Sequence, residues 1–169
     1  MIDKIFTSKA YTDIMIVSNG VEFACHKAFV GQSETLQNLV DRWAPEGKII
    51  MDEYSSDVVE NLIDFLYRRP MKEDSFQENL VNFLNIGEKY DLPELKWKAE
   101  IAMISSLDKD TFAEFLLAAD LFRAKKLKEA GLKFIADNKK LWTAGGDWME
   151  KFAKKPSLLI EIINVMASG

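Results

Sequence analysis

The chain has 169 residues, of which 48% are hydrophobic and 29% are charged, so its composition is that of an ordinary folded protein. This length fits one medium-sized domain, or one domain with a small appendage. No stretch approaches the roughly 18 consecutive apolar residues that a membrane span needs, and Asp3 and Lys4 interrupt the apolar amino terminus, which argues against a signal peptide. The single cysteine, Cys25, excludes an internal disulfide and a multi-cysteine zinc site. These features predict a nuclear or cytoplasmic protein that contacts no membrane.

The formal net charge is −5, and it is unevenly distributed. Residues 1–104 carry 11 Lys and Arg against 18 Asp and Glu, whereas residues 105–169 carry 11 against 9. An acidic first part argues against nucleic-acid binding, because phosphate binding requires clustered cations. The exception is a basic cluster at a predicted helix junction, formed by Arg123, Lys125, Lys126 and Lys128. The cluster has no interleaved aromatic residues, so a solvated helix face is the better interpretation.

Residues 12–30, T-D-I-M-I-V-S-N-G-V-E-F-A-C-H-K-A-F-V, predict a β-hairpin that leads directly into a helix. An apolar run is followed by Asn19-Gly20, two residues that tolerate the positive φ angles of a two-residue hairpin turn. Apolar and other residues then alternate over 21–26 with the period of a strand. Beyond His26 the apolar positions take helical spacing.

Two short helices are expected between residues 27 and 40, with Gly31 between them and Ser33 as the cap of the second. Residues 43–47 contain proline and glycine and predict a loop. Residues 49–51 are apolar and predict a third strand.

A helix is expected over residues 58–66, with Ser55 at its start, and helical spacing continues over residues 76–90. Asp91 is then expected to cap a further helix whose first turn contains a proline. These elements predict a mixed α+β domain over residues 11–104.

The remaining residues, 105–169, predict helices only. Thr111-x-x-Glu114 has the form of a capping box, and a helix follows it. A second helix is expected over residues 125–138, and a short aromatic helix around Trp148 leads to a final one. The final helix carries a wide apolar stripe formed by Leu158, Leu159, Ile162, Ile163 and Met166.

No motif in the sequence predicts catalysis. His26, the only histidine, adjoins Cys25, but neighbouring residues of a strand point to opposite faces and make a poor nucleophile–base pair. Cys25 lies inside the strand pattern, where a buried structural thiol is expected. The sequence contains no phosphate-binding Gly-Lys-Ser/Thr loop, metal-spaced cluster or isolated acid–base pair. We therefore expect neither an enzyme nor a bound cofactor or metal.

Several of these motifs resemble the BTB/POZ family. The first is T-D-(apolar)-V-x-x-x-G-x-E-F-x-x-H-K-A, which begins at Thr12, and it is followed by F-L-Y at 65–67 and E-K-Y-D-L-P-E-L-K at 88–96. L-A-A-D-L-F at 117–122 and W-M at 148–149 resemble the carboxy-terminal extension of the MATH-BTB family of speckle-type POZ proteins.

The resemblance covers most of the chain and implies its domain organisation. It implies an N-terminal arm over residues 1–10, and a BTB/POZ fold, a small mixed sheet flanked by helices, over residues 11–104. An all-helical 3-box/BACK-like extension is implied over residues 105–169.

The resemblance also implies a homodimer. In the family, the positions that match Asp13 and Lys27 form a charged pair near the dimer interface. The other interpretation is that the two are independent surface charges. The apolar part of the interface is expected to comprise Ile5, Phe6, Phe29 and Val30.

A second partner implied by the resemblance is the cullin-3 N-terminal domain. In cullin-binding members a loop carries an apolar-x-Glu motif whose apolar residue enters a pocket on the cullin. The matching segment here is Ala44-Pro45-Glu46. Because alanine is a small anchor, either the adjacent Trp43 takes its place or the contact is weaker. The rest of the expected cullin surface comprises Tyr90, Leu92 and Phe115.

The resemblance thus predicts a dimeric adaptor that holds cullin-3 for a ubiquitin ligase and contributes no catalytic residue. Family receptors carry a substrate-binding MATH domain ahead of the BTB domain, which this sequence lacks, so the chain is either a part of such a receptor or a short self-associating protein. The alternative function is a BTB self-association or partner-binding module of the transcription-repressor kind, without cullin binding. The helical extension favours the adaptor, and the altered loop favours the alternative.

The final helix matches a helix that provides a second self-association surface in the family. Ile162 and Ile163 are the expected contact residues, and the family has an aromatic residue where this chain has Ile163. Covering the extension's own helices is the plainer explanation of the stripe.

Overall fold

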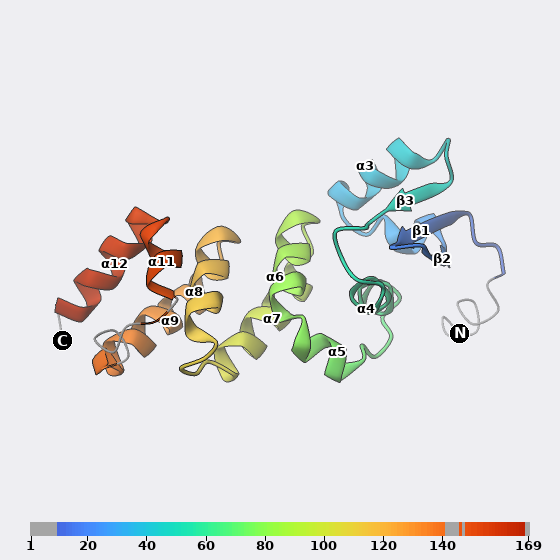
Figure 1. The fold of residues 1–169 in the computed structure, drawn as a ribbon. Coiled ribbons are helices and arrows are strands. Elements are labelled where there is room, and N and C mark those ends of the chain that lie inside the picture. Colours follow the sequence, from blue (N-terminus) through green and yellow to red (C-terminus); the bar gives the residue numbers. More distant parts are fainter. Residues whose placement is uncertain (1–9, 141–145, 147, 168–169) are drawn as a thin grey trace. The chain divides into compact units, whose positions relative to one another are not determined.

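The computed structural model describes residues 10–140, 146 and 148–167 (Figure 1). The chain forms two compact units, residues 1–96 and 97–169. The strands of the first unit are β1 (Ile14–Ser18), β2 (Val21–Cys25) and β3 (Lys48–Ile50). Its helices are α2 (Lys27–Val30), α3 (Glu34–Trp43), α4 (Ser56–Leu66), α5 (Glu73–Glu78) and α6 (Leu80–Lys89). The next helix, α7 (Pro93–Ser105), begins in the first unit and ends in the second.

The predicted hairpin is present. Asn19 and Gly20 have φ angles of 47° and 83°, as a two-residue turn between β1 and β2 requires. The strand order in the sheet is β2-β1-β3, with β1 antiparallel to β2 and parallel to β3. Ser33 caps α3 by accepting a hydrogen bond from the Leu36 amide at 3.1 Å, and Ser55 caps α4 in the same way. The α+β prediction is therefore confirmed.

The core of the first unit lies between one face of the sheet and the helices. The central strand, β1, buries Ile14 and Ile16, while Met15 and Val17 on its other face are partly exposed. Most of α4 is buried, and Figure 1 shows this helix almost end-on. The apolar side chains of this core with no exposed surface include Val30, Leu36, Ile49, Val58, Val59, Leu62, Ile63, Phe83 and Leu84.

Buried polar groups of α4 have partners, as a core without water requires. Asn61 accepts a hydrogen bond from the Lys72 amide at 2.7 Å and donates one to the Lys72 carbonyl at 3.2 Å, which holds the connection between α4 and α5. Asp64 forms an ion pair with Arg69, just beyond the end of the helix. Cys25 is fully buried, and burial raises the pKa of its thiol to about 12. The predicted structural thiol is thus confirmed.

Two predicted details of this unit are wrong. Residues 76–90 do not form one helix, because Asn79 leaves the helical backbone (φ −124°) and separates α5 from α6. Asp91 does not cap α7, because it has a left-handed φ of 50° and the Lys96 amide bonds to the Leu92 carbonyl instead.

The second unit contains the later part of α7 with α8 (Phe112–Leu121), α9 (Lys125–Asp137), α11 (Trp148–Ala153) and α12 (Pro156–Ala167). Helix α8 packs against α9, and α12 packs against α9 and α11. These helices enclose a hydrophobic core of the second unit, formed by Phe112, Ala113, Leu116, Ile135, Phe152, Leu158 and Ile162. Glu100, buried on α7, accepts a hydrogen bond from the Leu127 amide at 2.9 Å and so caps α9 from another helix.

The predicted capping box at Thr111 is also wrong. Thr111 precedes α8, but its backbone is helical and its side chain makes no capping bond. Its hydroxyl instead donates to the Ser106 carbonyl at 3.0 Å. Asp108 takes the predicted role one turn earlier, since its carboxylate accepts from the Asp110 and Thr111 amides at 2.8 and 2.9 Å.

Gly87 is required where α6 meets the start of α7. A Cβ atom at this position would lie 2.6 Å from the Lys96 Cβ and 2.7 Å from its Cα and N. Because two of these atoms are backbone, a rotamer change cannot relieve the clash. The turn between α6 and α7 is thus fixed by a close approach that only glycine permits.

We predict that Gly87→Ala lowers the free energy of unfolding by about 2 kcal/mol, as overpacking of a close contact does. Gly131→Ala is the matched control, because it also lies inside a helix but its added Cβ would meet only the flexible Leu116 side chain, at 3.1 Å. Chemical denaturation followed by circular dichroism measures both. Equal stability of Gly87→Ala and the wild type would show that the contact is not a constraint.

Candidate interaction surfaces

The first candidate surface surrounds the start of α2. Asp13 lies beside Lys27, as predicted, but its carboxylate accepts a hydrogen bond from the backbone amide of Lys27, at 2.8 Å. Over residues 10–140 the structure records no ion pair between the two side chains. Asp13 is exposed and Lys27 half-buried, so the two side chains form no buried pair of charges within the protomer, and the predicted pair near a dimer interface stays a prediction. The carboxylate acts instead on the first amide of a short helix.

His26 joins this surface to α4. Its amide donates to the Tyr67 hydroxyl at 2.8 Å, and its imidazole Nδ1 lies 2.7 Å from the same oxygen. The imidazole Nε2 lies 2.8 Å from the Ala10 carbonyl. Because a carbonyl only accepts, neutral His26 carries its proton on Nε2, and Nδ1 accepts a hydrogen bond from the Tyr67 hydroxyl proton. Burial raises the pKa of Tyr67 to about 12, which keeps that proton in place at neutral pH.

The predicted apolar interface residues differ in what they expose. The Phe29 ring is half-buried and stacks on the Tyr67 ring, with centroids 4.6 Å apart. Val30 has no exposed surface and belongs to the core of the protomer, so it can support an interface only from beneath. Ile5 and Phe6 lie outside the described residues.

Tyr11 is a candidate that the sequence pattern did not reveal. Its side chain is 94% exposed, and its φ of 62° is rare for a bulky residue. Hydrogen bonds hold the chain on both sides of it, from His26 to the Ala10 carbonyl and from the Asp13 amide to the Cys25 carbonyl at 3.0 Å. Two-residue periodicity starts only at the strand, so backbone geometry was needed to single out this aromatic residue.

The second candidate surface is the connection between α3 and β3. Trp43 was expected in a loop, but it is the last residue of α3 and is half-buried, as is Ala44. The amides of Glu46 and Gly47 donate to the Trp43 carbonyl at 3.1 and 2.9 Å, and the Gly47 carbonyl accepts from the Met15 amide at 2.8 Å. The connection is therefore ordered by backbone bonds, and it presents the exposed Glu46.

The remaining residues predicted to contact cullin are buried in their own units. Tyr90 and Leu92 are 5% and 6% exposed, and Phe115 is 7% exposed. The Tyr90 carbonyl accepts from the Ser33 hydroxyl at 2.6 Å, and its ring lies 5.0 Å from the Lys89 ammonium. These side chains lie beneath the surface, so a partner would contact mainly the residues that surround them.

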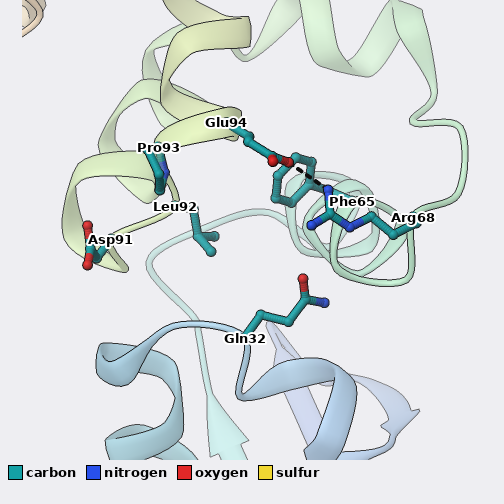
Figure 2. A pocket seen from close by; sticks show the side chains of 7 residues that line it. All are labelled: Gln32, Phe65, Arg68, Asp91, Leu92, Pro93 and Glu94. Carbon is teal, nitrogen blue, oxygen red and sulfur yellow. Dashed lines mark hydrogen bonds and ion pairs between the residues drawn. The ribbon is translucent and has the colours of Figure 1, made fainter.

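A small pocket opens beside Leu92 in the first unit (Figure 2). It has a volume of about 150 Å³ and is lined by Gln32, Phe65, Arg68, Asp91, Leu92, Pro93 and Glu94. Figure 2 shows Arg68 and Glu94 joined across one side, where the guanidinium and carboxylate are 2.6 Å apart. The guanidinium also lies 5.9 Å from the Phe65 ring centre. The side-chain amide of Gln32 donates to the Phe29 carbonyl at 2.8 Å, so the pocket adjoins the surface around α2.

The outer side of α12 is the third candidate surface. Ile162 has no exposed area and belongs to the core of the second unit, whereas Ile163 is 51% exposed. Ile160, one turn before it, is 59% exposed. The apolar stripe thus has an inner side that covers the neighbouring helices and an outer side that faces solvent.

Metal centres and membrane-spanning helices are two other features that the described residues do not form. Within residues 10–140, 146 and 148–167, no group of three or more His, Cys, Asp and Glu is placed to hold a metal ion. No helix in that same part of the chain is both long and apolar enough to cross a membrane.

Comparison with known proteins gives the family. The model of the BTB/POZ domain matches residues 2–107. A BTB/POZ domain-containing protein of Arabidopsis thaliana is 29% identical over 79% of this chain and 50% of its own length. BTB and MATH domain-containing protein 42 of Caenorhabditis elegans is 21% identical over 94% of this chain and 40% of its own.

TD and POZ domain-containing protein 3 of Mus musculus is 25% identical over 98% of this chain and 47% of its own length. The chain thus spans half or less of the length of these relatives. The family model covers more than half of the chain, and the mixed sheet with its flanking helices agrees with it. The chain belongs to the BTB/POZ family, whose domains are protein-interaction modules.

Proposed function

We propose that the chain is a dimeric BTB adaptor that binds the cullin-3 N-terminal domain and so serves a ubiquitin ligase. The observation that carries the proposal is the connection between α3 and β3, where Trp43 stands half-buried beside the exposed Glu46 on a backbone held by three hydrogen bonds. A fixed backbone lowers the entropy lost on binding. The match to a MATH-BTB protein and the helices after residue 105 support this function and a 3-box/BACK-like role for those helices.

Such an adaptor works by position and needs no reacting group. It holds the ligase scaffold at one surface and brings a bound substrate near it. Dimerisation doubles the number of ligase and substrate sites in one assembly, which raises the effective concentration of each for the other. The surface around α2 supports the dimer, because it exposes Tyr11 and part of Phe29 on a backbone fixed by His26.

The alternative function is a partner-binding module that does not engage cullin. The pocket beside Leu92 favours it, since its wall combines the Phe65 ring with the charges of Arg68 and Glu94. A cavity of about 150 Å³ fits one apolar side chain of a partner rather than a small-molecule ligand, whose sites usually begin at about 300 Å³.

For the dimer, we predict that light scattering at micromolar concentration gives twice the 19.3 kDa mass of the chain. Tyr11→Ser should weaken the dimer by about thirtyfold, because a buried aromatic anchor contributes about 2 kcal/mol. Val21→Ser is the control, since it also removes an exposed apolar side chain, 43% exposed on β2. A monomer mass for the wild type would refute the dimer.

For cullin-3, we predict that Trp43→Ala weakens binding at least about tenfold, and that Glu46→Lys weakens it by reversing a charge at the edge of the contact. Because Trp43 is half-buried, Trp43→Ala also affects the fold, whereas Glu46 is exposed and its substitution should not. Asn38→Ala, exposed on α3, is the control. Calorimetry measures all three.

Two outcomes would count against the cullin surface. Unchanged binding of Glu46→Lys would show that cullin-3 contacts the chain at a different surface. Absence of binding by the wild type at tens of micromolar, with the dimer intact, would favour the alternative module.

A second self-association surface on α12 is part of the same proposal, because dimers joined through another interface form chains. We predict that Ile163→Lys removes concentration-dependent assembly beyond the dimer in sedimentation velocity, since it places a charge on an apolar contact. Leu121→Lys, at a residue 59% exposed at the end of α8, should leave assembly unchanged. Equal sedimentation of wild type and Ile163→Lys at high concentration would leave the outer side of α12 without this role.

A further inference from the structure

Two serines of the chain are followed three residues later by an acidic residue. They are Ser75, in S-F-Q-E, and Ser105, in S-S-L-D. The two sequences are alike in the feature that acid-directed protein kinases read, an acid at the third position downstream. The structure gives the two hydroxyls opposite environments.

Ser105 is the last residue of α7 and is exposed. Its hydroxyl donates to the Ile101 carbonyl at 2.9 Å, a local bond that opens when the end of the helix frays. The segment that follows is irregular and mostly exposed up to Asp110. A kinase can therefore reach the hydroxyl and the residues after it without unfolding the core.

The carboxylates that follow Ser105 are exposed, and that of Asp108 stays ionised at neutral pH. Asp108 is fully exposed, and its carboxylate accepts hydrogen bonds from the Thr111 and Asp110 amides, which lower its pKa. The exposed Asp110 adds a second negative charge two residues later. A basic substrate cleft would meet both carboxylates on the same side of the serine in sequence.

Ser75 lies inside α5, and its hydroxyl oxygen is buried without a hydrogen-bond partner among the described residues. Its neighbour Phe76 is 1% exposed, and the centroids of the Phe76 and Phe83 rings are 5.1 Å apart. A kinase would have to pull this helix out of the core to reach the serine. The same sequence feature is thus hidden at Ser75 and displayed at Ser105.

We propose that Ser105 is a phosphorylation site for an acid-directed protein kinase. The Ser105 oxygen attacks the γ-phosphorus of Mg-ATP, the bond from that phosphorus to the ADP oxygen breaks, and the serine proton passes to the base of the kinase. The products are phosphoserine and ADP, and no oxidant or reductant is needed.

The phosphate would act on the connection between α7 and α8. It adds nearly two negative charges at the carboxyl end of α7, where the helix dipole is also negative, and it repels Asp108. The hydroxyl bond to the Ile101 carbonyl is lost. The turn before α8 is held to the same place through Thr111, whose hydroxyl donates to the Ser106 carbonyl at 3.0 Å. Phosphorylation should therefore unwind the last turn of α7 and loosen the start of α8.

The test uses the full chain, casein kinase 2 as the acid-directed enzyme, and Mg-ATP, with sites located by mass spectrometry. Synthetic peptides of residues 70–83 and 100–113 show how well the kinase phosphorylates each sequence in the absence of the fold. We expect both peptides to be modified. In the folded chain we expect Ser105 to be modified at least about tenfold faster than Ser75, because a buried site reacts only through rare local opening. The Ser105→Ala chain should lack the rapidly added phosphate.

Three results would overturn the proposal. They are an unmodified 100–113 peptide, a modified peptide with Ser105 unmodified in the folded chain, or equal modification of Ser75 and Ser105 in the chain. The structural consequence has its own readout, amide hydrogen exchange at Phe112 and Phe115. Exchange there should be faster after modification than in the Ser105→Ala chain treated in the same way, and unchanged exchange would show that the connection between α7 and α8 does not respond.

Discussion

The buried hydroxyl of Tyr67 fixes the part of the first unit from which the proposed dimer surface is built. The hydroxyl oxygen accepts a hydrogen bond from the His26 amide, the hydroxyl donates one to the His26 ring, and the Tyr67 ring stacks on Phe29. Through the second nitrogen of His26 the same network reaches Ala10 and positions Tyr11. If the hydroxyl were lost, a backbone amide and an imidazole nitrogen would lose their partner, at a cost of about 1–3 kcal/mol for each buried group. The hairpin, α2 and the end of α4 therefore behave as one support.

The loop that carries Glu46 is held by a second constraint, the hydrogen bond from the Met15 amide to the Gly47 carbonyl. Gly47 has a φ of 69°, which lets the chain leave α3 and enter β3 parallel to β1 within a few residues. The loop is therefore attached to the central strand of the sheet. Both proposed surfaces of the first unit depend on the register of β1, since Asp13 precedes this strand and Met15 lies in it.

Local rules predicted most of the elements. The Asn19-Gly20 turn, the Ser33 and Ser55 caps and the helices of the second unit follow from residue type and period, and the structure agrees. Predictions failed where a competing local hydrogen bond or a close helix contact overrode the preference of a single residue. Thr111 lost its capping role to Asp108, and Asp91 adopts a left-handed conformation at the turn where α7 approaches Gly87.

The candidate surfaces were less accessible to sequence reasoning. Family motifs located the stretch from Asp13 to Lys27, but only the structure shows that the Asp13 carboxylate accepts a hydrogen bond from a backbone amide and that Val30 and Ile162 are buried. Exposure of Tyr11 and the pocket beside Leu92 depend on segments far apart in sequence, so no pattern of period two or 3.6 could indicate them.

In the proposed complex, one dimer of the chain holds two cullin-3 N-terminal domains. The mass of this complex can be measured by light scattering on a gel-filtration column loaded with the chain and the cullin-3 N-terminal domain at tens of micromolar. We expect a single species with two copies of each protein. Separate elution of a dimer of the chain and of free cullin domain would rule out this complex.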